Sequence, residues 1–262
     1  MTAYVGMTTK TIQIKGHGGD MIDAYVAQPD GQGPFPGVLV IHHMPGWDEW
    51  STEVTRRFAH HGYLAICPNQ HYRAGEGTLE EVVAKVREQG GINDERVIGD
   101  LQAGIDWLNG HAQSTGKVGI IGFCSGGRIV YMGAAKFNGI NAAVDCWGGN
   151  VAVPPGSITP SQPQAVIDMT PDIKVPLLGF FGNDDKNPDP DQVNTMEAEL
   201  KKHGKDYEFH RYDGAGHAFF AWERPSYRQE QAVDAWQKVW AFYEKHVGAG
   251  NTSAAGAVPA GR

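Results

Sequence analysis

Short runs of continuous apolar residues alternate along the chain with longer segments in which apolar residues recur every three or four positions. The first pattern is typical of strands buried on both faces, and the second of helices with one buried face. We expect strands at residues 10–16, 23–29, 37–43, 63–68, 117–123, 142–149, 175–182 and, followed by a loop, within 207–219. We expect helices at residues 48–62, 93–111, from 126 onward, 190–204 and 226–247. The alternation predicts an α/β fold with a mostly parallel, doubly wound sheet, helices on both faces and an antiparallel hairpin at one edge.

The length of 262 residues suits one domain, which we expect to span residues 1–247. The remaining segment, 248–262, is small and polar and is expected to be a mobile tail. A proline-rich stretch, 148–176, has little periodicity. Loops of this length often cover sites, so the sequence leaves open whether this one is a lid or an inert surface excursion.

Composition narrows the possible partners and compartments. Hydrophobic residues make up 41% and charged residues 20%, as in ordinary globular proteins, and the net charge of −8 without a Lys/Arg block argues against binding to nucleic acid or to an anionic membrane. The three cysteines show no CxxC spacing, which argues against disulfides or a structural zinc site. We find neither an export signal nor an apolar stretch of about 20 residues, and we therefore expect a cytoplasmic protein.

The stretch "IGFCSGG", residues 121–127, places a cysteine between glycines directly after an apolar strand and before a helix. This is the form of a nucleophile elbow with Cys124 at its centre. Glycines suit such an elbow because the turn strains the central residue, and a helix N-terminus favours a thiolate. A buried small cysteine in a glycine-rich turn is the alternative at this point.

A nucleophile in this fold needs a histidine base and a carboxylate, which follow it in the order nucleophile, acid, histidine. Asp184 comes just after the strand "LLGFFG", and His217 lies in the loop "DGAGHAF" after another strand. The carboxyl ends of parallel strands meet in one crevice, so Cys124, Asp184 and His217 are predicted to form a triad. Asp185 competes with Asp184 for the acid position.

With these motifs in place, the chain resembles the dienelactone hydrolase (carboxymethylenebutenolidase) family of the α/β-hydrolase fold, from about Gly16 to Val247. The elbow "GFCSGG", the strand end "FGNDD" with Pro188 after it, and the loop "GAGHAFF" leading through "RPSY" into a helix are similar to that family's motifs. The resemblance implies an α/β-hydrolase fold without a large cap domain, and hydrolysis of an enol-lactone or related ester through an acyl-cysteine.

In that likeness Cys124 attacks, His217 is the base and Asp184 orients it, with no metal and no cofactor. The backbone N–H groups of Ser125 and Met44 would form the oxyanion hole, each worth about 3 kcal/mol. A small-molecule ester or lactone would be the partner, and the protein would be a monomer or a small homo-oligomer.

The chain departs from the family pattern after its third strand. The best-known members carry a glutamate where "HHMPG" places His43. A histidine at this position could pair with the thiolate, bind substrate or have no catalytic part. Adjacent histidines on a strand point to opposite faces, so His42 and His43 cannot form a metal pair.

The family's substrate-binding arginines are only partly present. Arg73 matches one of them, but Ala221 stands where a second is expected. Trp147 and Trp222, near predicted strand ends, are candidates to line an apolar pocket.

Two other functions therefore stay open. One is a general carboxylesterase or thioesterase acting on neutral esters, and the other is a ligand-binding member of the fold that no longer turns over.

Overall fold

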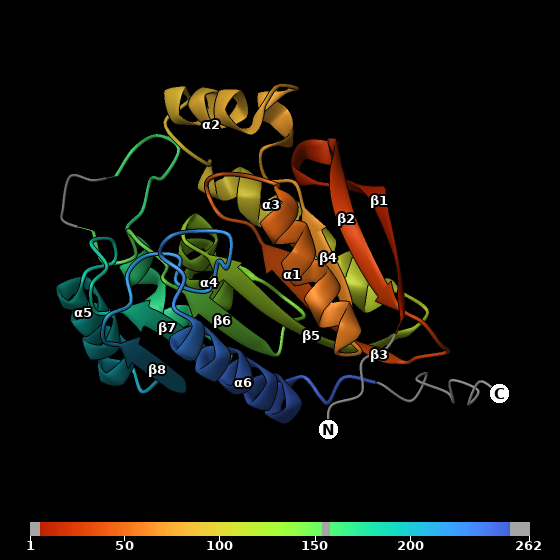
Figure 1. Cartoon of the computed structure of the whole chain (residues 1–262). Coiled ribbons are helices and arrows are strands. Elements are labelled where there is room, and N and C mark those ends of the chain that lie inside the picture. Colours follow the sequence, from red (N-terminus) through yellow and green to blue (C-terminus); the bar gives the residue numbers. More distant parts are fainter. Residues whose placement is uncertain (1–5, 154–157, 252–262) are drawn as a thin grey trace.

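The computed structural model describes residues 6–153 and 158–251. Eight strands form one sheet in the order β1-β2-β4-β3-β5-β6-β7-β8 (Figure 1). The pairs β1/β2 and β2/β4 are antiparallel, and the other five neighbouring pairs are parallel. The strands are β1 (Met7–Lys15), β2 (Met21–Pro29), β3 (Phe35–Ile41), β4 (Leu64–Pro68), β5 (Ser114–Phe123), β6 (Ala142–Cys146), β7 (Leu177–Gly182) and β8 (Tyr207–Tyr212). The expected mostly parallel sheet with an antiparallel edge is confirmed.

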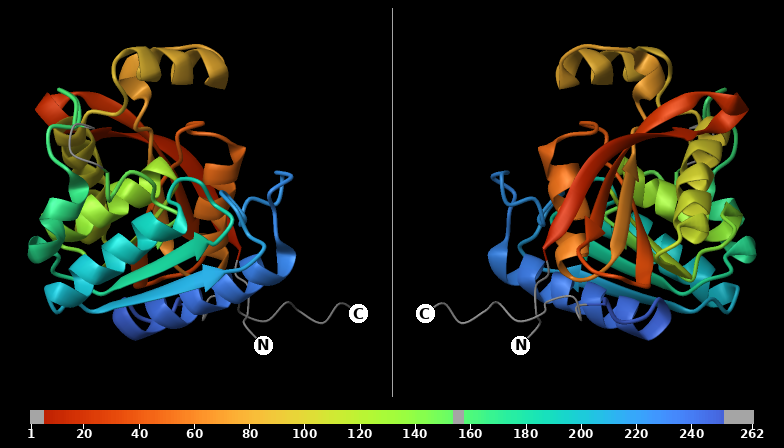
Figure 2. Two further views of the ribbon diagram at one scale, coloured as in Figure 1. Left: turned by 90° about the vertical axis from the view of Figure 1, so that its left-hand side faces the viewer. Right: turned by 90° about the vertical axis from the view of Figure 1, so that its right-hand side faces the viewer.

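Helices cover both faces of this sheet (Figures 1 and 2). The apolar stripes of α1 (Glu49–His60) and α6 (Gln229–His246) belong to one core cluster, and those of α3 (Asp94–Gly110), α4 (Ser125–Lys136) and α5 (Pro190–Lys202) belong to the other. Short 3-10 turns occupy His17–Gly19, Tyr72–Ala74 and Val166–Asp172. The doubly wound arrangement follows from the alternation of apolar runs and amphipathic segments.

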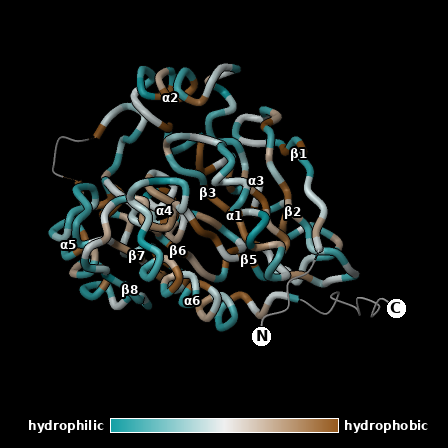
Figure 3. Tube along the Cα trace, in the orientation of Figure 1, coloured by the Kyte–Doolittle hydropathy of each residue, from teal (hydrophilic) through white to brown (hydrophobic). Residues whose placement is uncertain are grey.

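The central strands hold the core. All seven residues of β3 and all five of β4 are buried, which is why these runs are continuously apolar. In Figure 3 the hydrophobic colour follows the inner strands, while α2 (Leu79–Glu88) shows much of the hydrophilic colour. The carboxyl ends of β3 to β8 therefore form a rigid edge from which the loops of the site extend.

Helix α2 was not expected from the periodicity, because only Val83 and Val86 of its ten residues are buried. It lies away from the sheet, at the top of Figure 1. A local signal does exist: Thr78 and Glu81 form a capping box at its start.

Two boundaries differ from the expected ones. The strand expected at 142–149 ends at Cys146, because Trp147 adopts a positive φ of 45° and turns the chain. The packed chain also continues past residue 247: the Tyr63 hydroxyl donates to the Gly248 carbonyl at 3.0 Å, and the Asn251 N–H donates to the Gly62 carbonyl at 3.0 Å. The rest of the expected tail, 252–262, lies outside the described residues.

The proline-rich stretch 148–176 includes residues 154–157, which also lie outside the described residues. Its middle is attached to the junction of α2 and α3, where the Ser161 carbonyl accepts from the Asp94 N–H at 2.9 Å and the Ser161 hydroxyl donates to the Gln89 carbonyl at 3.3 Å. The later part turns into the 3-10 segment Val166–Asp172. Whether the stretch acts as a lid stays a prediction.

Candidate active site

Cys124 is the single residue between the end of β5 and the start of α4. Its φ of 55° and ψ of −117° lie in a region that side-chain-bearing residues rarely adopt. The flanking glycines make this turn possible, because a Cβ at Gly122 would lie 2.2 Å from the Gly126 carbonyl oxygen and one at Gly126 would lie 2.3 Å from the Ile41 carbonyl oxygen. The strained elbow expected from the sequence is present.

His217, in the loop after β8, lies between a thiol and a carboxylate. Its Nδ1 is 2.8 Å from Oδ2 of Asp185, and its ring also hydrogen-bonds the Cys124 thiol. Burial opposes a charge on the imidazole, but the hydrogen bonds to Asp185 and Cys124 outweigh it and raise the pKa of His217 to about 10. The three groups therefore form one connected chain of polar contacts.

The carboxylate in this chain is Asp185, whereas the sequence analysis had placed Asp184 there. Asp185 is 4% exposed and Asp184 is exposed. The reason is the turn after β7, in which the Asp185 N–H donates to the Gly182 carbonyl at 3.2 Å, so that the second aspartate and not the first points inward. The Asn187 N–H also donates to Asp185 Oδ1 at 2.9 Å, which fixes the carboxylate.

The environment of Cys124 favours the thiolate. Burial alone would raise the pKa of this thiol, but His217 and the backbone N–H groups of Ser125 and Met44 lower it below its ordinary value. Ser125 and Met44 are the two residues expected to supply the oxyanion hole. Their N–H groups converge on the sulfur from the start of α4 and from the loop after β3.

His43 pairs with a carboxylate that the sequence analysis did not single out. Its Nε2 is 2.6 Å from Oδ2 of Asp48, and both side chains are largely buried. Asp48 also caps α1 by accepting from the Ser51 N–H at 2.9 Å. Burial would raise the pKa of Asp48, but the hydrogen bond and charge of His43 and the contacts with Ser51 lower it to about 2. Nε2 of His43 is therefore paired with Asp48 and not with the Cys124 thiol.

His42 lies on the other side of the strand end, as expected for adjacent residues of a strand. Its Nδ1–H donates to the His43 carbonyl at 2.8 Å, and its Nε2 accepts from the Gln70 N–H at 3.0 Å. Both nitrogens of a neutral ring are therefore used. Burial, together with His71, lowers the pKa of His42 well below its ordinary value.

Arg73, which the resemblance suggested as an anion-binding residue, is paired with two aspartates. Its Nε donates to Asp20 at 2.7 Å, and one Nη donates both to Asp100 at 3.0 Å and to the His17 carbonyl at 3.1 Å. Asp100 is almost fully buried, so the pair ties the loop after β4 to α3. The role in substrate binding that the resemblance implied for Arg73 stays a prediction.

The two tryptophans differ in position. Trp147 is 1% exposed and its ring centroid lies 6.3 Å from that of His217, so it packs beneath the histidine. Trp222 is 57% exposed in the loop before α6. Only Trp147 contacts the site residues.

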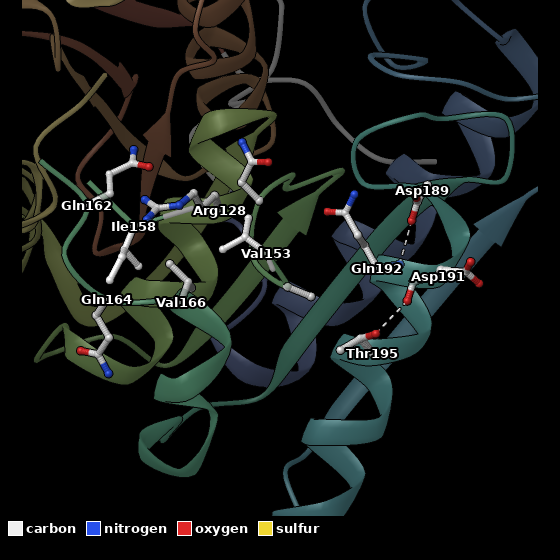
Figure 4. A pocket seen from close by; sticks show the side chains of 12 residues that line it. Arg128, Val153, Ile158, Gln162, Gln164, Val166, Asp189, Asp191, Gln192 and Thr195 are labelled. Atoms are coloured by element: carbon white, nitrogen blue, oxygen red, sulfur yellow. Dashed lines mark hydrogen bonds between the residues drawn. The ribbon is translucent and has the colours of Figure 1, made fainter. Parts of the chain in front are cut away.

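Three cavities lie among the loops near the carboxyl ends of the strands. One of about 490 Å³ is bordered by Gly46, Trp47, His71 and Leu79. A second, of about 400 Å³, is bordered by His71, Arg73 and Arg96. A third, of about 460 Å³, lies between Arg128, the stretch after β6 and the start of α5 (Figure 4). In Figure 4 the Arg128 guanidinium stands at its edge; Asp94 holds it there at 2.6 and 2.9 Å.

The sheet order, the strained cysteine elbow and the His217 contacts define an α/β-hydrolase fold with its site at the strand ends. Residues 22–247 match the model of the dienelactone hydrolase family. The chain belongs to this family and is a carboxylic ester hydrolase.

Relatives cover nearly the whole chain. A Yersinia pestis protein named "Putative carboxymethylenebutenolidase" is 35% identical over 87% of this chain and 85% of its own length. A protein of the same name from Escherichia coli (strain K12) is 34% identical over 88% of this chain and 84% of its own length. The crystal structure titled "Putative Dienelactone Hydrolase" from Klebsiella pneumoniae subsp. pneumoniae MGH 78578 has a TM-score of 0.84 at 31% identity, covering 92% of this chain and 99% of that one. The resemblance drawn from the motifs is confirmed.

Within residues 6–153 and 158–251, no three His, Cys, Asp or Glu side chains are grouped so that they could hold a metal ion. Over the same ranges, the helices are too short or too polar to cross a bilayer.

Proposed function

We propose that this protein hydrolyses a lactone or small carboxylic ester through an acyl-cysteine intermediate on Cys124. The observation that carries the proposal is the placement of His217 between the Cys124 thiol and the buried Asp185 carboxylate. Asp185 takes the orienting role first assigned to Asp184. In this arrangement the imidazole is held in one tautomer and can move a proton between the sulfur and the substrate.

Acylation follows from the resting charges. The pKa of Cys124 is lowered and that of His217 is raised to about 10, and both shifts favour transfer of the thiol proton to the imidazole, which leaves a thiolate. The thiolate attacks the carbonyl carbon, and the N–H groups of Met44 and Ser125 hold the oxygen that becomes negative. When the C–O bond breaks, His217 gives its proton to the leaving alkoxide. A lactone keeps that alcohol as part of the acyl group.

Deacylation reverses the roles. His217, now neutral, takes a proton from water, and the resulting hydroxide adds to the thioester carbonyl. The C–S bond breaks, the carboxylic acid leaves, and the thiolate–imidazolium pair is restored. No metal or cofactor takes part in these steps. The partner in these steps is a small-molecule ester or lactone.

A neutral ester is the second candidate substrate class beside a dienelactone-type anion. The observation in its favour is Arg73, whose guanidinium is held by Asp20 and Asp100. A substrate carboxylate would have to compete with both aspartates for it.

A cytoplasmic location accords with the three free cysteines, one of which must stay reduced to attack.

Trapping the intermediate tests the function. The wild-type protein is mixed with phenyl acetate, quenched in acid and weighed intact by mass spectrometry, and peptide mapping locates the label. We expect one acetyl group on Cys124 of the wild type, none in Cys124→Ala, and much slower acetylation in His217→Asn, because His217 promotes the thiolate and protonates the leaving group. Hydrolysis by Cys124→Ala at the wild-type rate would exclude the mechanism, and the absence of any turnover would favour the non-catalytic binding protein.

A further inference from the structure

His71 lies buried in the loop after β4, and its side-chain nitrogens make no hydrogen bonds to the described residues. The residue is 3% exposed, and neither Nδ1 nor Nε2 has a hydrogen-bond partner among the described residues. Its ring packs edge-on against His42, with the centroids 4.8 Å apart. Buried polar atoms are rarely left without a hydrogen-bond partner. We therefore expect a hydrogen-bond partner for this ring from outside the described chain.

The space for such a partner is the cavity of about 490 Å³ that His71 borders. Gly46 lies beside the ring on this side, since a Cβ there would be in van der Waals contact with His71 Nδ1 at 3.4 Å and with a Leu79 methyl carbon at 3.5 Å. Trp47, Leu79 and Val82 supply apolar surface to the same cavity. Its size and lining suit a small ring or short chain that carries a polar group.

The protonation state of His71 determines which polar group can hydrogen-bond to it. Burial and the nearby His43 lower the pKa of His71 to about 4, so the ring is neutral at physiological pH. A neutral imidazole has one N–H donor and one acceptor nitrogen. A hydroxyl group, which both donates and accepts, is the complement of such a ring.

The charges around the cavity disfavour an anion. Asp23 and Glu76 line it, and its lining includes no lysine or arginine. The nearby Lys85 ammonium donates to the Glu76 carbonyl at 2.9 Å, and Arg73 is held by aspartates. A ligand carboxylate placed here would face like charges without a counter-ion.

The loop after β3 contributes both to the reaction centre and to this cavity. Met44, whose N–H faces the Cys124 sulfur, is followed two residues later by Gly46 and then Trp47. Asn69 contributes from the end of β4, and the antiparallel β2 brings Asp23 to the same edge of the sheet. One short loop thus carries the Met44 N–H that faces the sulfur and, two and three residues later, one wall of the cavity.

We propose that this cavity is the specificity pocket of the enzyme and selects esters whose distal part is uncharged and carries a hydroxyl group recognised by His71. The inference rests on the proposed function, whose site it completes. It assigns His71 to substrate recognition and Glu76 to the exclusion of anionic esters.

Three aryl acetates test the hydroxyl preference: phenyl acetate, 4-hydroxyphenyl acetate and 4-acetoxybenzoate. We compare kcat/KM of each ester between variants and wild type, so that the intrinsic reactivity of the ester cancels. His71→Phe should lower the value for 4-hydroxyphenyl acetate by roughly five- to tenfold, as the loss of a hydrogen bond predicts, and leave phenyl acetate nearly unchanged. His71→Gln, which keeps a donor and an acceptor, should retain most of the preference. His203→Phe, at the exposed end of α5, is the matched control.

A second experiment tests whether Glu76 excludes anionic esters. It compares Glu76→Lys with the control variant Glu80→Lys. Both residues are exposed and the change in net charge is the same, but only Glu76 lines the cavity. Glu76→Lys should raise kcat/KM for 4-acetoxybenzoate several-fold relative to phenyl acetate, and Glu80→Lys should not.

Binding separates this inference from the proposed function. Cys124→Ala does not consume the ester, so its affinity for 4-hydroxyphenyl acetate can be measured by saturation-transfer NMR even if the wild-type protein hydrolyses nothing. We expect weaker binding when His71→Phe is added and little change with His71→Gln. Equal losses on phenyl acetate and 4-hydroxyphenyl acetate, or a wild-type preference for 4-acetoxybenzoate, would overturn the pocket assignment while leaving the acyl-cysteine mechanism intact.

Discussion

Nδ1 of His217 lies 2.8 Å from Oδ2 of Asp185, a carboxylate that the protein buries almost completely. The neighbouring Asp184 points to solvent, although its backbone N–H is fixed by the Ala215 carbonyl at 2.9 Å. Two adjacent aspartates thus have opposite environments. Since only one of them touches the imidazole, their substitution separates an orienting carboxylate from a surface charge.

Asp185→Asn should lower kcat by about 10²- to 10⁴-fold, because the amide can no longer hold the imidazole in the required tautomer or stabilise its positive charge. Asp184→Asn removes the same charge one residue away and should change kcat less than twofold. The measurement is steady-state hydrolysis of phenyl acetate by both variants. If Asp184→Asn were the more damaging substitution, the position of the acid would revert to the one first inferred from the sequence.

The thiolate–imidazolium pair predicts an unusual pH dependence of alkylation. With the pKa of Cys124 lowered, the rate of labelling by iodoacetamide should rise at a lower pH than that of an unperturbed thiol, which reacts mainly above about pH 8.5. In His217→Asn the favourable partner is lost and burial dominates, so the rise should move to higher pH. The rate is measured between pH 5 and 9, with the labelled peptide identified. An unchanged profile in the variant would disconnect His217 from the thiol.

The same pair makes stability depend on pH in a defined direction. The folded-state pKa of His217 is about 10, above its ordinary value of 6.5. Its stabilising contribution is therefore complete below about pH 6.5 and is lost as the pH rises through about 10. The difference in unfolding free energy between wild type and His217→Asn should shrink over this range in urea titrations.

The sequence was sufficient to predict the sheet, the cysteine elbow and the position of His217 beside the thiol. Each depends on a local pattern: an apolar run, a cysteine between glycines, or a histidine after a strand. The sequence was not sufficient to choose between Asp184 and Asp185, because that choice depends on a turn that points one of the two side chains inward. The same holds for Arg73, which matched a family position yet pairs with Asp100 on another element. Such ion pairs join segments that are far apart in the sequence, so the pattern of polar and apolar residues does not reveal them. Helix α2 was missed because its buried face is only two residues wide.

The His43–Asp48 pair should matter for both stability and activity. Asp48 caps α1 and accepts from a buried imidazole, so Asp48→Ala should cost about 2–3 kcal/mol of unfolding free energy. Asp189→Ala, which removes a helix cap without a histidine partner at the start of α5, is the control and should cost about 1 kcal/mol. Activity should fall in Asp48→Ala alone, because His43 immediately precedes the Met44 N–H.

The pH dependence of this pair has the opposite sign to that of His217. The pKa of Asp48 is lowered from 3.8 to about 2, so its contribution is complete above about pH 3.8 and is lost as the pH falls through about 2. Equal unfolding free energies of Asp48→Ala and Asp189→Ala at pH 7 would show that His43 adds nothing to the cap.

Arg73 offers a test that separates structure from substrate binding. Arg73→Ala leaves Asp100, whose side chain is 2% exposed, without its counter-ion, and should destabilise the fold by about 3–5 kcal/mol. Replacing both members, as Arg73→Met with Asp100→Leu, removes the unpaired charge and should recover much of that loss. In the folded double variant, the ratio of kcat/KM for 4-acetoxybenzoate to that for phenyl acetate should equal the wild-type ratio. A selective loss on the anionic ester at constant stability would instead return Arg73 to the substrate site, because a purely structural ion pair has no means of distinguishing the two esters.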